Sequence, residues 1–289
     1  KAKLIQQNEI TEVKENKFPT EIIDLPSEGK LYPSNNPLSS GKIEMKYMTA
    51  KEEDILASQN LIQKGIVLDK LFQALIVSNG EGQAVNYGDI LTGDKDAIMV
   101  AARVLGYGKD YSVKMTDPYD EDNEQEVLID LTEIENKTIK DEHIQTPGMN
   151  LFEFTLPISK KLIQFRLPTH TTEKSIEKEL KLKAKVAGVD KSIDKTLSTR
   201  LKNMIVSIDG EEDRNKIAGF VANEFLAQDS RNFRLYVEEI MPGVVLEFNF
   251  VSATTEEEKV IPIPINLNFF LMFSYRVHSV CLCQYFYLL

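Results

Sequence analysis

The chain has 289 residues, of which 42% are hydrophobic and 27% are charged, and its formal net charge is −11 at pH 7. This length is enough to bury a sizeable core and favours two domains, or one large domain. The acidic balance argues against bulk nucleic-acid binding, which needs clustered Lys and Arg, and the only two cysteines, Cys281 and Cys283, exclude a disulfide framework.

The first residues are charged and aperiodic. Residues 1–20 contain no apolar stretch of the kind found in signal peptides, so we expect a flexible charged arm on a protein that folds in the cytosol.

A Pro- and Gly-containing segment follows, with the sequence LPSEGKLYP at Leu25–Pro33. Each proline fixes its own φ and keeps the preceding residue out of the α region, so we predict an extended arm. An extended arm with apolar side chains is suited to docking on another protein. The predicted docking residues are Pro26, Gly29, Leu31, Tyr32 and Pro33.

The next region is predicted to be mainly helical. Thr49 and Glu52 have the spacing of a capping box and predict a helix that runs to about Ile62. Apolar residues at helical spacing predict two further helices over 68–76 and 94–105, the second ending at Gly106.

Two short apolar runs, Tyr111–Met115 and Val127–Leu131, predict a β-hairpin with an acidic turn between them. The alternating Asp120, Asp122 and Glu124 carry oxygens that a hard cation would accept. The turn lacks the Gly and the final Glu of a calcium-binding loop, so a solvated hairpin tip is the favoured interpretation and a metal site the weaker one.

The C-terminal half, residues 151–265, is predicted to be a helical bundle bracketed by hairpins. One hairpin is expected over 152–167 and the other over 245–265, with helices at 172–186, 194–208, 213–226 and 229–240. The fold class is therefore α+β, with an N-terminal α+β domain at 21–145, which carries the extended arm, joined by a short linker to an α+β domain at 151–265.

Charged clusters in this half have ordinary explanations. Seven lysines between 174 and 195 alternate with glutamates at the spacing of i,i+4 pairs, which is typical of a solvated helix face, with an acidic partner as the alternative. Arg residues near the helix starts suit ion pairs within the chain or between chains. His143 and His170 have no catalytic companion at a motif spacing, so the sequence predicts neither an enzyme nor a cofactor.

The last residues, 266–289, differ abruptly from the rest. This apolar tail contains no acidic residue and no Lys, and Arg276 lies near its middle, which disfavours a membrane span. His278 and the two cysteines are a poor set for a metal. We interpret the tail as an anomalous segment, with packing into a partner as the alternative.

Six segments together resemble the baseplate protein family of T-even-type contractile-tailed phages, in matching order and spacing. They are Leu25–Pro33, Lys46–Leu56, Gly106–Tyr111, Leu156–Thr169, Thr199–Gly210 and Ala227–Arg234. The resemblance implies a non-enzymatic component of the tail baseplate, in or next to the central hub or needed for its assembly.

The chain departs from the family pattern in two places, one after Phe270 and one between Thr116 and Val127. Relatives are expected to close with Trp and Pro, but this chain has no Trp, which fits a shifted reading frame after Phe270. Some relatives carry a cysteine-bearing, zinc-ribbon-like hairpin where this chain has no Cys between Thr116 and Val127. A metal role is therefore not carried over.

The sequence thus favours a structural protein of the virion that works through protein–protein interfaces. Its expected partners are other baseplate and tail proteins in multiple copies, assembled in the host cytoplasm, without nucleic acid or membrane. A transient assembly chaperone absent from the mature virion is the first alternative. An acidic metal-dependent hydrolase, which would need Asp120, Asp122 and Glu124 to converge with other carboxylates, is the second.

Overall fold

The computed structural model describes residues 18–184, 194–265 and 269–270. Helices and antiparallel sheets are both present, which confirms the predicted α+β class. Most of the predicted 1–20 arm and of the 266–289 tail, together with Lys185 and Lys191, lies outside the described residues. No helix in the described ranges is long and apolar enough to cross a membrane.

A small sheet opens the chain. Its strands are β1 (Thr20–Asp24), β2 (Lys42–Lys46) and β3 (Ile76–Ser78), in that spatial order and antiparallel. Ile43 and Met45 of β2 are fully buried, as their alternation predicts. The Pro- and Gly-containing arm connects β1 to β2 through the 3₁₀ turn η1 (Pro37–Ser40).

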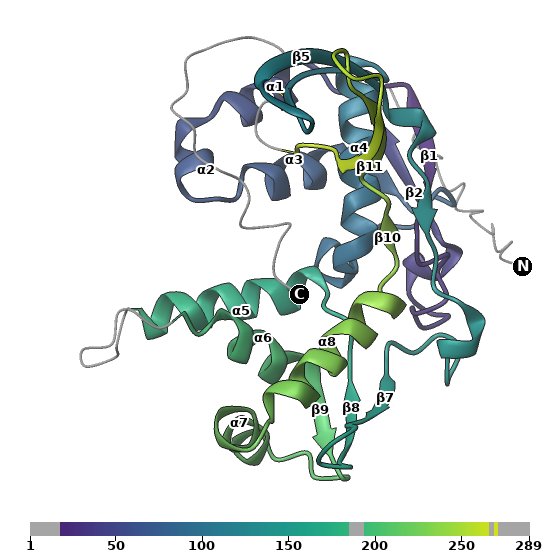
Figure 1. Cartoon of the computed structure of the whole chain (residues 1–289). Helices are drawn as coiled ribbons and strands as arrows, with labels where there is room; N and C mark the ends of the chain where they lie inside the picture. The colour runs from purple at the N-terminus through teal and green to yellow at the C-terminus, as the bar shows by residue number, and fades with distance from the viewer. Residues whose placement is uncertain (1–17, 185–193, 266–268, 271–289) are drawn as a thin grey trace, which may run out of the picture.

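Four helices follow in the N-terminal half. They are α1 (Ala50–Ala57), α2 (Gln59–Gln63), α3 (Val67–Leu75) and α4 (Thr92–Tyr107), with the 3₁₀ turn η2 (Tyr87–Asp89) before the last. The α3 and α4 helices are in contact with this sheet, and α2 lies away from it (Figure 1). The single helix predicted from Thr49 to Ile62 is wrong, because Ser58 adopts an extended conformation and divides it. The α4 helix continues through Gly106 and ends at Gly108, whose positive φ accommodates the turn.

The predicted acidic hairpin is present and longer than expected. Strand β4 (Asp110–Asp117) pairs with β5 (Asp120–Asp130), with Val113 opposite Val127. The 3₁₀ turns η3 (Leu131–Glu133) and η4 (Asp141–His143) follow, with the short strand β6 (Asn136–Lys137) between them.

The C-terminal half contains a second sheet with helices beside it. Strands β7 (Phe152–Thr155), β8 (Leu162–Phe165) and β9 (Ile205–Ile208) form an antiparallel sheet in that order. The helices are α5 (His170–Lys183), α6 (Thr196–Met204), α7 (Arg214–Asn223) and α8 (Ala227–Ile240). The helix predicted over 194–208 is therefore wrong in its last turn. The β-branched residues there pair with β8 instead, Ile208 lying opposite Ile163.

The last strands return to the N-terminal half. Strand β10 (Gly243–Val244) pairs with β6, and the hairpin of β11 (Glu247–Val251) and β12 (Glu258–Pro262) lies beside β4–β5 (Figure 1). The side chain of Gln125 donates a hydrogen bond to the Val251 carbonyl at 2.9 Å, and Ser252 Oγ donates to Asp117 Oδ2 at 2.6 Å. The second predicted hairpin is therefore present, and it packs against the β4–β5 hairpin.

The core is continuous between the two halves. A single cluster of buried apolar side chains runs from the β1–β2 arm to α8 and ends at Phe269 and Phe270. The start of α4 packs directly on the chain after α8, where a Cβ at Gly93 would lie 1.7 Å from the Pro242 carbonyl oxygen. Only glycine fits at that crossing, so the two halves meet there without an intervening side chain.

Candidate interaction sites

The predicted docking arm folds back into the protein's own core. Leu31 and Tyr32 are 1% and 5% exposed, and Pro26 and Gly29 are also buried, so only Pro33 of the five predicted docking residues is exposed. The prediction that Leu31 and Tyr32 dock on a partner is corrected by this burial: their side chains are already in contact with the chain itself. Gly29 (φ +76°) makes the reversal possible, because a Cβ there would lie 2.4 Å from the Ser39 carbonyl oxygen.

A buried carboxylate holds the arm in place. Asp94, in the first turn of α4 and fully buried, accepts hydrogen bonds from Tyr32 Oη at 2.6 Å and Ser27 Oγ at 2.7 Å, and from the Ser27 backbone N–H at 2.9 Å. Tyr32 Oη in turn accepts from the Leu91 N–H at 2.9 Å. Burial raises the pKa of Asp94, and the hydrogen bonds from Tyr32 and Ser27 oppose that rise. The arm is thus a structural clamp on α4.

Thr49 and Glu52 form the predicted capping box at the start of α1. The Thr49 N–H and Oγ1 donate to Glu52 Oε2 at 3.1 and 2.6 Å, and Lys46 Nζ lies 2.8 Å from Glu52 Oε1. Burial raises the pKa of Glu52, but the hydrogen bonds from Lys46 and Thr49 lower it by more, so the pKa lies below its ordinary value. The cap therefore also ties α1 to the adjoining strand β2.

The acidic hairpin does not gather its carboxylates into a metal site. Asp122 and Glu124 point outward along one face of β5, while Asp120 lies near the turn, 3.5 Å from Thr254 Oγ1. Within the described ranges no three His, Cys, Asp or Glu side chains are placed to hold an ion. The structure therefore does not bring together the set that the hydrolase alternative needs.

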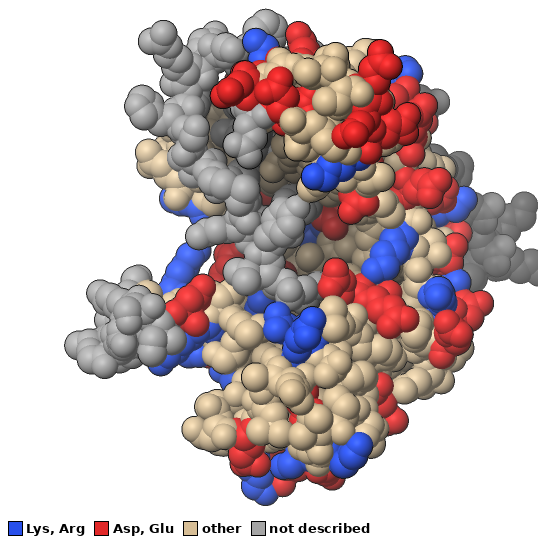
Figure 2. All heavy atoms as spheres, in the orientation of Figure 1, with Lys and Arg blue, Asp and Glu red and all other residues tan. Residues whose placement is uncertain are grey.

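These carboxylates instead make a charged surface. Figure 2 shows acidic side chains gathered over the region of the β4–β5 and β11–β12 hairpins. Exposed members are Asp122, Glu124, Glu126, Glu256, Glu257 and Glu258. Across the hairpin, Glu126 lies opposite Lys114, whereas Glu124 lies opposite the uncharged Thr116. The net charge of the chain is thus concentrated in part on the N-terminal half.

A polar cluster that sequence reasoning missed joins the two halves. Asp69 of α3 lies 2.8 Å from Lys174 Nζ of α5, 3.2 Å from Lys95 Nζ of α4 and 3.6 Å from His170 Nδ1. Tyr87 Oη donates to the same carboxylate at 3.1 Å. Burial opposes the Asp69 charge, but the two lysines hold its pKa below the ordinary value. The apolar stripe of α3 gave no sign that Asp69 would turn inward.

His170 makes this cluster sensitive to acid. Lys95 Nζ lies 3.3 Å from its Nδ1, so the ring accepts that hydrogen bond as neutral imidazole, and burial together with Lys95 lowers the His170 pKa to about 4. A folded pKa below the unfolded value of about 6.5 means that the unfolded chain binds the proton first, so stability falls as pH drops from about 6.5 to 4.

We predict that His170→Asn reduces the loss of folding stability between pH 6.5 and 4. The urea midpoint of the wild type should fall more steeply between pH 6.5 and 4 than that of the variant, and comparing the two at each pH cancels the titration of other groups. Parallel midpoint curves would contradict the assignment of a neutral buried His170.

The charged helix α5 is largely paired within the chain. Arg200 of α6 forms a bidentate pair with Glu173 of α5, at 3.0 and 2.9 Å, and Glu179 contacts Lys183 and Lys202. This answers the question of intrachain or interchain pairing for Arg200. The lysine stretch is accordingly a solvated, internally paired helix face over its described residues.

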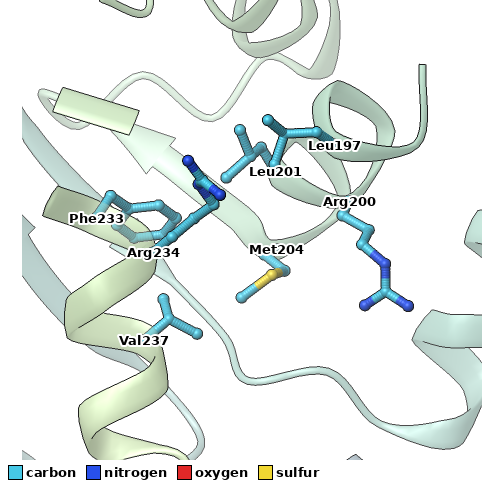
Figure 3. Close-up of a pocket in the computed structure, with 7 residues that line it drawn as sticks. All are labelled: Leu197, Arg200, Leu201, Met204, Phe233, Arg234 and Val237. Atoms are coloured by element: carbon cyan, nitrogen blue, oxygen red, sulfur yellow. The ribbon is translucent and has the colours of Figure 1, made fainter. Parts of the chain in front are cut away.

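A small apolar pocket lies between α6 and α8 (Figure 3). Its floor consists of the buried Leu201, Met204, Phe233 and Val237, and the partly exposed Leu197 lies at its rim. Figure 3 shows the guanidinium of Arg234 projecting over the pocket toward Leu201, whereas that of Arg200 points away. The spacing of these apolar residues predicts each helix, but it does not predict that the two helices come into contact.

Comparison with known families identifies a relationship over most of the chain. The model of a family described as "T4 bacteriophage base plate protein" matches residues 19–270, which include both halves of the fold and the Phe269–Phe270 pair. No curated protein and no solved structure matches.

Proposed function

Because the chain belongs to the T4 bacteriophage base plate protein family, we propose that it is a structural component of a contractile tail baseplate, placed in or next to the central hub. Family membership implies contact with other baseplate proteins and a place in the virion tail. The finer proposal is that the protein acts through the shape and charge of its surfaces, in more than one copy per tail, and makes no covalent change to its partners.

The observation that carries this proposal is the length of the family match, 19–270, over one continuous core. Both halves share that core, so the chain is suited to a rigid building block rather than to two modules that close on a substrate. The polar groups brought together inside it, around Asp94 and Asp69, are hydrogen-bonded to structural partners. Assembly in the host cytoplasm remains part of the proposal.

The test is the protein's presence in finished particles. A phage with an amber codon in this gene is grown with and without a suppressing host, and purified tails are examined by quantitative mass spectrometry. We expect the protein at a fixed ratio to other baseplate proteins in mature tails, and no complete baseplates without suppression.

The same measurement distinguishes the chaperone alternative. A protein that is required for assembly but absent from purified tails would overturn the structural proposal and indicate a transient assembly factor. Complete, infectious tails in its absence would overturn both.

A further inference from the structure

The outer face of the β11–β12 hairpin has an exposed apolar centre. Side chains alternate along both strands, so Phe250 is fully buried while Val251 and Val260 are 49% and 63% exposed. Val251 lies opposite Glu258 and Val260 opposite Asn249, which makes the two valines diagonal neighbours on one face. The exposed Pro262 extends the same face along β12.

Carboxylates border this apolar centre. The exposed ones on the hairpin are Glu247, Glu256, Glu257 and Glu258. Glu258 accepts a hydrogen bond from Asn249 Nδ2 at 2.7 Å, and within the described ranges no cation pairs with any of the four. The hairpin's own cation is on the other face, where Lys259 Nζ lies 6.0 Å from the centre of the Tyr119 ring. The outer face is therefore apolar in its middle and uniformly negative around it.

This charge determines which partner fits the face. Nucleic acid and anionic lipid surfaces carry the same sign as the carboxylates and are repelled. A second copy that presented the same face would place Glu opposite Glu, which is unfavourable. A partner with Lys or Arg is attracted instead, and covering Val251 and Val260 removes apolar area from water. The fitting occupant is therefore both basic and apolar.

The strand register gives the spacing that such an occupant needs. Glu258 lies opposite Val251, and Glu247 precedes Val251 by four residues, so the two carboxylates are about 14 Å apart along the hairpin. An extended chain presents its side chains i, i+2 and i+4 on one side over the same length. Cations at i and i+4 would then meet the two carboxylates while an aliphatic side chain at i+2 covers Val260.

We propose that the outer face of β11–β12 binds an extended segment of another baseplate protein with the pattern basic–x–aliphatic–x–basic. Its two Lys or Arg residues pair with Glu247 and Glu258, and its aliphatic side chain lies on Val251 and Val260. This inference rests on the proposed structural function and names the chemistry of one of its partners.

The experiment cross-links this face in infected cells, before tails are purified, so that it reports docking even for a protein that later leaves the particle. A photoreactive benzoylphenylalanine replaces Val251, and mass spectrometry identifies the cross-linked segment. The yield is compared between the wild-type background and the double variant Glu247→Lys with Glu258→Lys. The matched control is Glu212→Lys with Glu238→Lys, which changes the net charge equally at two exposed positions of the C-terminal half.

We expect a cross-link to a segment of another baseplate protein with the stated pattern. The double reversal at Glu247 and Glu258 should lower its yield at least tenfold, and the control should leave it within twofold. Val260→Thr, which keeps the β-branched shape but adds a hydroxyl, should lower it about threefold. The purified variants should keep the wild-type thermal midpoint; if the double reversal lowers the midpoint, Val260→Thr decides the outcome.

Several results would overturn the docking site. They are a cross-link to a second copy, to another part of this chain, to an acidic segment or to no protein, and equal losses in the double reversal and its control. If the protein is present in tails but neither the double reversal nor Val260→Thr affects the cross-link, the docking inference fails while the structural function stands. If the protein is missing from tails, the function fails and the cross-link still decides the docking site.

Discussion

Replacing Asp94 by alanine is expected to lower the free energy of unfolding by about 3–5 kcal/mol, because three buried donors lose their acceptor at a cost of about 1–3 kcal/mol each. The change leaves the Ser27 N–H, Ser27 Oγ and Tyr32 Oη without their common acceptor in a site where Asp94 is fully buried. Water does not reach these donors unless the Leu25–Pro33 arm separates from α4. Urea denaturation of the purified protein measures the loss.

Two further variants, at Tyr32 and Glu28, should lose less stability than Asp94→Ala. Tyr32→Phe keeps the ring but removes one of the three hydrogen bonds to Asp94 and the acceptor of the Leu91 N–H, so a loss of about 2–3 kcal/mol is expected. Glu28→Ala, at an exposed position of the same arm, should change stability by less than about 0.5 kcal/mol. An Asp94→Ala protein within about 1 kcal/mol of wild type would show that the arm is not clamped on α4.

The clamp also changes how the arm is tested for docking. Alanine at Leu31 or Tyr32 would weaken the core, so failure of such a variant to enter tails would report misfolding. A partner can still contact Pro33 and the neighbouring exposed residues. The arm's role in docking is therefore a proposal limited to that exposed edge, and it is tested at Pro33 with stability measured in parallel.

Short-range features were predictable because neighbouring residues determine them. The Val113–Val127 pairing follows from alternation on both sides of a turn, and the start of α1 follows from the Thr49–Glu52 spacing. The strand at Ile205–Ile208 was also detectable, since three of its four residues are β-branched, but the apolar spacing of the preceding helix continues through it.

Long-range features were not predictable, because composition does not reveal which surface covers an apolar segment. Leu31 and Tyr32 have the same chemistry whether they contact a partner or their own chain, and the acceptor for Tyr32 lies 62 residues away. Asp69 and His170 likewise meet only after both halves have folded. Arg234 is half-buried because α6 approaches α8, and the spacing within either helix does not predict that contact.

The return of Phe269 to the N-terminal half leads to the second large effect. Phe269 is fully buried, its ring centroid lies 5.0 Å from that of Tyr111, and the Arg103 guanidinium lies 6.0 Å from the ring. Tyr111 Oη also donates to the Pro264 carbonyl at 3.0 Å. Phe269 thus closes the space between α4 and the β4–β5 hairpin.

Phe269→Ala is expected to cost about 3–5 kcal/mol of unfolding free energy, since it removes a buried ring and leaves a cavity beside Tyr111. The effect should appear in the N-terminal half, as faster amide hydrogen exchange in β4 and α4 than in β7 and β8. Val260→Ala, at a position 63% exposed on the same returning segment, is the control and should change stability by less than about 0.5 kcal/mol. Loss of protection confined to the helices α5–α8 would instead assign Phe269 to the packing of the C-terminal half, because the exchange pattern follows the half whose packing Phe269 completes.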